Sequence, residues 1–342
     1  MLTTNFPNFC PKKDCPCYQS LDNKITKDGT KKLKISGERR QMYYCHGGKH
    51  RFSETAYSDL WRKQGTEKEY IQTAKLSTYG LSAEQIADVL ERDVRTIEEW
   101  LSGICEKSQR FHESICLIVG ITLQFLQMDE LWSYLKNKNR QMWVFVALDP
   151  MSKFWVNFEL GSRTNLTANR LVKNLKALLK WNPSLVLKVT TDKLAAYKNA
   201  LEKQFREIPY VYLQILKQRI KRKLKTVKKF WVKGMPEDFP EGTQNTSYIE
   251  RLNLTLRQRI SYLHRKTLGY CKKQANLNRI LWINLFDYNY VQFHQSLRID
   301  LTGEKNKFHK RYKQITPAMK IGLTNSQLSW RYLLVVPIPK SG

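Results

Sequence analysis

The spacing of hydrophobic residues changes along the chain, from helical between about residues 66 and 103 to strand-like from about residue 122 onward. Apolar residues three and four positions apart predict helices, whereas alternation of apolar and polar residues predicts strands. Three runs alternate in succession, with short polar breaks between them: "TLQFLQMDELWSYL", "QMWVFVALD" and "KFWVNFEL". Successive strands with short connections indicate an antiparallel meander.

The meander is followed by alternating helical and strand-like segments. "NLTANRLVKNLKALLKW" and "AAYKNALEKQF" are typical of helices, "LVLKVTTD" and "YVYLQI" of strands. This order predicts an α/β fold in which helices cover the faces of a mixed sheet. Residues 247–267 form a further predicted helix, with an apolar stripe of Ile249, Leu252, Leu256, Ile260 and Leu263.

The segment "GLSAEQIADVLERDVRTIEEWL" has the period of a helix-turn-helix. Ser82 with Gln85 predicts a capping box for the first helix, and Asp93 can cap the second. If the unit binds duplex DNA, the second helix enters the major groove with Arg92 and Arg95 at its leading end. A plain helical hairpin used for packing or dimerisation is the alternative.

The charge of the chain points to an anionic partner. Its 342 residues include 59 Lys and Arg against 30 Asp and Glu, a formal net charge of +29, while the 42% hydrophobic content is ordinary for a globular protein. Nucleic acid is the leading candidate, because binding to phosphates compensates such an excess. An anionic membrane surface is the rival, but no amphipathic anchor or lipidation motif supports it.

Many of these basic residues are concentrated in one run. Residues 217–233 carry nine Lys or Arg and no acid, with Phe230 and Trp231 near the end. A charge run of this kind forms either a solvated helix or loop, or an element that binds phosphates. On the second interpretation the expected DNA contacts are Arg219, Arg222, Lys223 and Lys225.

No signal peptide is visible, and the most apolar run, "ICLIVGITLQFLQM", is shorter than the roughly 20 residues that span a bilayer. We therefore expect a cytoplasmic, nucleoid-associated protein.

Four of the seven cysteines lie in the first 45 residues, which in a cytosolic protein favours a metal site over disulfides. Tetrahedral zinc takes four sulfur or nitrogen ligands and can fold a segment too small to fold by apolar burial. Cys17 and His46 are possible substitutes, and a degenerate finger that binds no metal is the alternative, because Gly48 stands where a second knuckle cysteine would be. The predicted zinc ligands are Cys10, Cys15, Cys45 and His50.

Three carboxylates are candidates for a catalytic metal site. Asp129 lies within the first strand of the meander, Asp192 ends the fourth predicted strand, and Glu250 begins the helix of residues 247–267. Such oxygen ligands suit Mg²⁺ or Mn²⁺, and two ions would support cleavage and transfer of phosphodiesters. Strand alternation places Glu130 on the opposite face, outside this site. Arg257, two helical turns after Glu250, is expected to contact a phosphate.

At these residues the sequence resembles a known family. "QMDELWSYL", "TTDKLAAY", "SYIERLNLTLRQRISYLHRKTL" and "TPAMKIGLT" are similar to the catalytic half of DDE transposases of the insertion sequence one type, and the N-terminal segments resemble that family's DNA-binding half. The resemblance implies a ribonuclease H-like core, Asp129, Asp192 and Glu250 as metal ligands, and a synaptic multimer on transposon ends. It also implies DNA contacts at Asn253, Arg257, Arg265 and Lys266.

Four parts are therefore expected: a zinc-ribbon-like module (1–53), a helix-turn-helix domain (54–112), a catalytic domain (120–300) with a basic insertion (217–246), and a C-terminal tail (301–342). The expected function is binding of terminal inverted repeats, metal-dependent cleavage, and joining of the 3′-hydroxyls to double-stranded target DNA by a dimer or larger assembly. The alternatives are a domesticated or inactive DNA-binding regulator and a general ribonuclease H-like nuclease.

Overall fold

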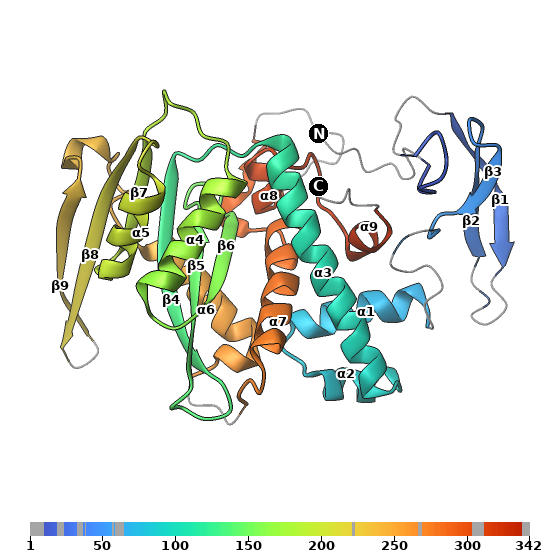
Figure 1. Cartoon of the computed structure of the whole chain (residues 1–342), viewed down its shortest axis with the longest axis horizontal. Helices are drawn as coiled ribbons and strands as arrows, with labels where there is room; N and C mark the ends of the chain where they lie inside the picture. Colours follow the sequence, from blue (N-terminus) through green and yellow to red (C-terminus); the bar gives the residue numbers. More distant parts are fainter. Residues whose placement is uncertain are drawn as a thin grey trace.

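The computed structural model describes most of the chain, and Figure 1 shows a helical and α/β body with a small N-terminal sheet to one side. The described residues are 10–18, 24–32, 37, 39–56, 58, 65–220, 223–265, 269–302 and 311–336.

The N-terminal sheet is a small module with its own hydrophobic cluster. Its strands β1 (Ile25–Lys32), β2 (Arg39–Cys45) and β3 (His50–Ser53) are antiparallel in that order. The cluster of buried residues in this module is separate from the main core and comprises Cys10, Cys15, Tyr43, Cys45, Phe52 and Ala56. A core of this size rarely stabilises a fold without a metal or a covalent link.

The two helices predicted for the segment 80–101 are present as α2 (Ala83–Leu90) and the start of α3 (Val94–Val119), and α1 (Glu67–Thr78) precedes them. Both predicted caps are confirmed. Ser82 and Gln85 form a capping box, and Asp93 accepts a hydrogen bond from the Arg95 backbone amide. Glu91 closes α2 in the left-handed conformation, with φ of 52°.

Helix α3 extends well beyond the predicted helix-turn-helix. Its 26 residues correspond to about 39 Å, and it packs along α7 (Gln274–Phe286) (Figure 1). Its buried residues share one hydrophobic core with the sheet. The expected boundary at residue 112 therefore lies inside a continuous helix, and the helical segment and the α/β segment are packed as one body.

The α/β segment has the ribonuclease H-like arrangement predicted from the sequence. An antiparallel meander continues through its first strand into two parallel strands, and the strand order is β6-β5-β4-β7-β8-β9. Crossover helices α4 (Asn165–Leu178) and α5 (Ala195–Gln204) cover one face of this sheet (Figure 1). The strands are β4 (Phe125–Tyr134), β5 (Gln141–Leu148), β6 (Trp155–Gly161), β7 (Leu187–Asp192), β8 (Tyr210–Ile220) and β9 (Lys223–Lys233).

Within the described residues, the basic run 217–233 forms strands and not the helix or loop that was one of its two interpretations. It forms the end of β8 and all of β9, an antiparallel pair in which Lys217 faces Val227. β9 is the edge strand of the sheet, so one of its sides lacks a neighbouring strand. Charged residues suit such an edge because they discourage pairing with other chains.

Helix α6 (Ser247–Arg259) lies on the other face of the sheet and ends eight residues before the predicted end at 267. The predicted apolar stripe is nevertheless buried throughout. Ile260 ends the helix, and Leu263 is buried from a following 3-10 turn, Ser261–Leu263. The helical spacing of apolar residues continues past the end of α6 because the 3-10 turn buries its apolar residue on the same side as the helix does.

The remaining elements complete the body around α7. A π-helical turn, Asp287–Val291, extends α7 and is followed by a 3-10 turn, Gln295–Leu297. Strands β10 (Ile299–Asp300) and β11 (Tyr312–Lys313) form a small hairpin, and α8 (Pro317–Lys320) and α9 (Trp330–Val335) follow. Among the helices of the described ranges, none is both long and apolar enough to cross a membrane.

His112 ties α3 to the sheet and to the π-helical turn. Its Nε2 lies 2.8 Å from the Val156 carbonyl oxygen, which can only accept, so Nε2 carries the proton. The Tyr290 hydroxyl therefore donates to Nδ1 over 3.0 Å. Complete burial lowers the pKa of His112 to about 4, so the folded protein holds this imidazole neutral at neutral pH.

We expect the free energy of unfolding to decrease as the pH falls from about 6.5 towards about 4. Between these values the unfolded histidine binds a proton and the folded one does not, so protons favour unfolding. The full effect is roughly 3 kcal/mol. Denaturant unfolding at several pH values measures it. His112→Gln, which cannot take up the proton, should show a weaker pH dependence than the wild type, and equal slopes would contradict this role.

Candidate functional site

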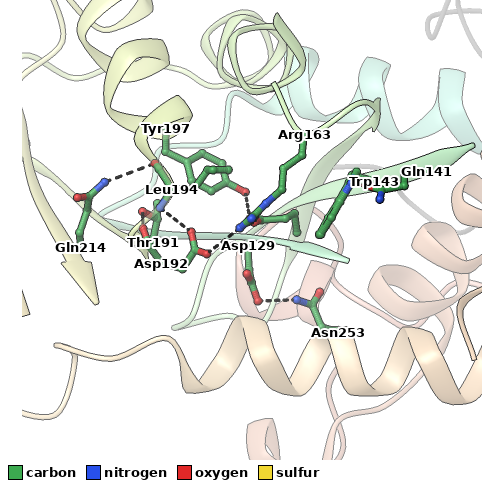
Figure 2. Close-up of polar contacts among 11 residues, drawn as sticks. Asp129, Gln141, Trp143, Arg163, Thr191, Asp192, Leu194, Tyr197, Gln214 and Asn253 are labelled. Carbon is green, nitrogen blue, oxygen red and sulfur yellow. Dashed lines mark hydrogen bonds and ion pairs between the residues drawn. The ribbon is translucent and has the colours of Figure 1, made fainter. Parts of the chain in front are cut away.

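Asp129 lies on the face of β4 that packs against α6. The Asn253 side-chain amide donates to Asp129 Oδ2 over 2.8 Å (Figure 2). Gln127, two residues earlier on the same strand face, docks the start of the helix. Its Oε1 accepts from the Ile249 backbone amide over 2.9 Å, and its Nε2 donates to the Asn245 carbonyl oxygen over 2.6 Å. β4 therefore fixes both Asp129 and the N-terminal turn of α6.

Asp192 comes to the same place from the neighbouring strand. β7 runs parallel to β4, and their pairing ends where Met128 faces Thr191. Asp129 and Asp192 are the next residues on the two strands, so both lie where the pairing stops. The Leu194 backbone amide donates to Asp192 Oδ1 over 3.2 Å, which orients the carboxylate.

Glu130 also belongs to this group, and the expectation that strand alternation would exclude it is wrong. Carboxylate oxygens of Asp129, Glu130 and Asp192 all lie within 4.8 Å of one another. Glu130 does leave the opposite face of β4, where it accepts from Tyr197 of α5 over 3.3 Å. Because β7 ends at Asp192, no paired strand separates the longer Glu130 side chain from the two aspartates.

Burial and mutual repulsion disfavour the charged forms of these acids. Burial raises the pKa of Asp129 to about 7, with smaller contributions from Glu130, Asp192 and Glu250. Burial also raises the pKa of Asp192 and of Glu130. A divalent cation among them would stabilise the carboxylates in their charged state, so the donor set suits a hard metal ion.

Glu250 lies in the first turn of α6, but its carboxylate is turned to β8. It forms an ion pair with Lys217 and accepts from the Thr246 hydroxyl over 2.8 Å. It is not part of the group of oxygens within 4.8 Å, although it is near enough to raise the pKa of Asp129. The structure thus brings Asp129 and Asp192 together, and Glu250 lies nearby in an ion pair with Lys217.

The residues predicted to contact DNA differ in their exposure and in whether they already have partners within the protein. Asn253 is only 8% exposed and is engaged with Asp129, so it positions a carboxylate instead of facing solvent. Arg257 donates to the Leu263 carbonyl oxygen over 3.1 Å, and Arg92 pairs with Glu69 at 2.7 Å. Arg95, Lys225 and Arg265 are exposed. Arg222, Lys266 and the side chains of Arg219 and Lys223 lie outside the described residues.

The predicted zinc ligands converge in the N-terminal module. One ligand atom from each of Cys10, Cys15, Cys45 and His50 lies within 4.8 Å of the others. Cys10 Sγ is 3.3 Å from His50 Nε2, and Cys15 Sγ is 3.9 Å from Cys45 Sγ. Burial raises the pKa of Cys10 to about 12, so without a cation this thiol is protonated, whereas a bound metal favours the thiolate.

The surroundings of this cluster also suit a tetrahedral metal. The backbone amides of Cys17 and Gly48 donate to the sulfurs of Cys15 and Cys45 over 3.4 and 3.3 Å. His50 Nδ1 donates to the Gly48 carbonyl oxygen over 3.1 Å, which leaves Nε2 free to bind a metal. A Cβ at Gly48 would lie 2.3 Å from Cys15 Sγ, so no side chain fits there.

The two alternative ligands lie outside the cluster. His46 contacts the Thr26 hydroxyl at 3.0 Å, and Cys17 packs against the cluster but is not among the four residues whose ligand atoms lie within 4.8 Å of one another.

Sequence reasoning missed Arg163, Tyr197 and Lys217. Arg163 lies in the short loop between β6 and α4 and contacts both Glu130 and Asp192. Nothing in the local pattern distinguishes such an arginine from a solvated one. Lys217 is the first residue of the basic run, so the run itself could have pointed to it.

Comparison with known proteins finds similarity to one transposase family. Residues 122–235 match the family model described as IS1 transposase. Insertion element IS1 2 protein InsB of Escherichia coli (strain K12) is 29% identical over 164 residues, which is 47% of this chain and 75% of that protein. For Insertion element IS1 protein InsB of Shigella sonnei the match has the same identity and covers 95% of the relative.

A solved structure, the Mos1 strand transfer complex, matches 44% of this chain and 60% of that chain with 12% identity. Its TM-score of 0.21 is too low to bear on the fold. The ribonuclease H-like fold rests instead on the strand order and on the family match. The match of residues 122–235 to the IS1 transposase model and the similarity to these InsB proteins support an IS1-type DDE transposase.

Proposed function

We propose that this transposase cuts the DNA ends of its own mobile element and joins the freed 3′-hydroxyls to target DNA, using Asp129, Asp192 and Glu250. The observation that carries the proposal is the meeting of Asp129 and Asp192 at adjoining positions on β4 and β7. Mg²⁺ or Mn²⁺ ions at these acids would activate the attacking water or hydroxyl and stabilise the leaving oxygen.

The protein's own residues hold the acids in place for this chemistry. Asn253 orients Asp129, and the Leu194 amide orients Asp192. Glu250 is one helical turn before Asn253, so a change in its side-chain rotamer, away from Lys217, turns it towards Asp129. We therefore assign Lys217 as the counter-ion of Glu250 until the metal is bound.

Basic residues beside the acids would hold the DNA backbone. Lys193 directly follows Asp192 and lies 3.8 Å over the Phe230 ring on β9. Lys225 and Lys228 are exposed on the same edge strand. Contacts of this kind bind phosphates without regard to sequence and weaken with salt.

Recognition of the element's ends would come from the N-terminal half. Arg95 is exposed at the start of α3, where a recognition helix contacts the major groove. Arg92 would first have to leave Glu69. We propose a structural zinc ion at the cluster of Cys10, Cys15, Cys45 and His50, which folds the adjoining module, and a dimer or larger assembly that holds two ends together.

The test uses full-length protein and duplexes carrying the DNA that flanks its own gene. We expect protection of inverted repeats, followed by Mg²⁺- or Mn²⁺-dependent cleavage that leaves a 3′-hydroxyl and by its joining to a second duplex. Binding without cleavage would indicate a DNA-binding regulator. Cleavage without preference for the ends would indicate a general nuclease.

A further inference from the structure

Arg163 reaches the acid cluster from the loop between β6 and α4. Its Nε donates to Glu130 Oε1 over 2.7 Å, and its Nη2 donates to the same oxygen. Nη2 is also 3.6 Å from Asp192 Oδ2 (Figure 2). The guanidinium therefore lies directly beside one of the two central aspartates.

Glu130 holds the Arg163 guanidinium in place. Its side chain is 2% exposed, and each of its oxygens already has a partner: Arg163 at Oε1 and the Tyr197 hydroxyl at Oε2. A buried carboxylate of this kind holds its arginine firmly, because removing the arginine would leave a charge without compensation. The contact with Asp192 is longer and weaker.

The rest of the guanidinium faces outward. The Arg163 side chain is 42% exposed, and its Cζ lies 4.9 Å from the Trp143 ring centroid, which supports the guanidinium from one side. Within the described part of the chain, its Nη1 group makes no hydrogen bond. A guanidinium that is fixed in place and still has unused N–H donors can bind the oxygens of a phosphate.

We propose that Arg163 binds a non-bridging phosphate oxygen of the DNA strand at the active site, and that Glu130 and Trp143 position it. The inference rests on the proposed function for the location of the DNA. Metal ions bound at Asp129 and Asp192 would compensate Asp192, which frees the Nη2 edge of Arg163. The anchor at Glu130 remains, so the arginine stays beside the reacting strand.

The primary test combines an Arg163→Ala change with DNA that carries a single neutral methylphosphonate, tiled along the backbone at the element's end. Binding is measured with Ca²⁺. We expect one position at which wild-type binding weakens about 10-fold while binding by R163A does not change, because the charge–charge contact is already lost. If the variant responds to every methylphosphonate as the wild type does, Arg163 touches no phosphate. This result does not depend on cleavage, so it can be separated from failure of the proposed function.

Cleavage kinetics provide the second readout. We expect R163A to lower kcat about 100-fold with little change in KM, and Arg163→Lys to recover only part of the loss, because a lysine lacks the planar fork. Mn²⁺ affinity should be retained. Cleavage by R163A within threefold of the wild type, or a loss of Mn²⁺ binding together with cleavage, would overturn the assignment.

Glu130→Gln tests the positioning role. The change should lower kcat in the wild-type background and have little further effect in the R163A background, because Glu130 acts through Arg163. If E130Q instead reduces Mn²⁺ affinity as strongly as Asp192→Asn does, Glu130 is a metal ligand and not an anchor.

Discussion

Asp129→Asn and Asp192→Asn are each expected to reduce metal-dependent cleavage of the element's ends by on the order of 10³-fold or more. Asparagine keeps the shape of the side chain and removes the negative charge that a hard cation needs. The two residues lie at adjoining strand positions with their oxygens in one group, so each variant should also lose Mn²⁺ affinity. Cleavage assays and calorimetric titration with Mn²⁺ measure the two effects.

Loss of folding would not explain such a result. Burial raises the pKa of both aspartates, so their charged forms cost stability in the metal-free protein. The neutral asparagines should therefore leave the free energy of unfolding unchanged or increase it. Glu159→Gln is a matched control, since Glu159 lies on β6 of the same sheet and pairs with Arg170 away from the cluster. Cleavage within tenfold of the wild type in either aspartate variant would refute their role.

Cys45→Ser is expected to abolish zinc binding and to unfold the N-terminal module. Among the described residues of this module, the hydrophobic cluster has only six buried members, so on the proposed assignment the metal supplies most of the stability. Structural zinc in small modules contributes on the order of 10 kcal/mol. Metal content by mass spectrometry and limited proteolysis of residues 10–56 measure the two effects, and end binding should fall with them.

Cys17→Ser is the matched control for this prediction. Cys17 is two residues from Cys15 and packs against the cluster, but it is not one of the four residues whose ligand atoms lie within 4.8 Å of one another, and serine keeps the backbone amide that donates to Cys15 Sγ. The control should bind one zinc ion and resist proteolysis as the wild type does. The main body has a separate hydrophobic core and should stay folded in both variants. A folded module without zinc in the wild type would contradict the assignment.

Local patterns predicted most of the fold because each reflects a local physical requirement. The alternating runs from residue 122 onward became the meander, and the Ser82–Gln85 box and the Asp93 cap formed as expected. The order of strands and helices was enough to predict the sheet arrangement, since crossover connections leave few alternatives.

Other features depend on contacts between distant segments. The basic run became a strand because β8 provides its partner, which the charge pattern did not reveal. Helix α3 continued past residue 112 because α7 covers it, far away in the sequence. Glu130 joined the aspartates because β7 ends beside it, and alternation along one strand says nothing about where its neighbour stops.

Glu250 shows the same limit within the site. Its place at the start of α6 was predicted, but its pairing with Lys217 depends on the hairpin of β8 and β9 beside the helix. On the proposed function, the geometry of the three acids would depend on whether a metal ion replaces Lys217 as the partner of Glu250.

A crystal structure with Mn²⁺ and DNA from the element's end tests this account most directly, because the anomalous signal locates the metal. We predict manganese bound to oxygens of both Asp129 and Asp192, with Glu250 released from Lys217 and turned to the same site. Manganese absent from these aspartates in a complex that cleaves its DNA, or Glu250 still paired with Lys217 there, would contradict the catalytic role of the three acids.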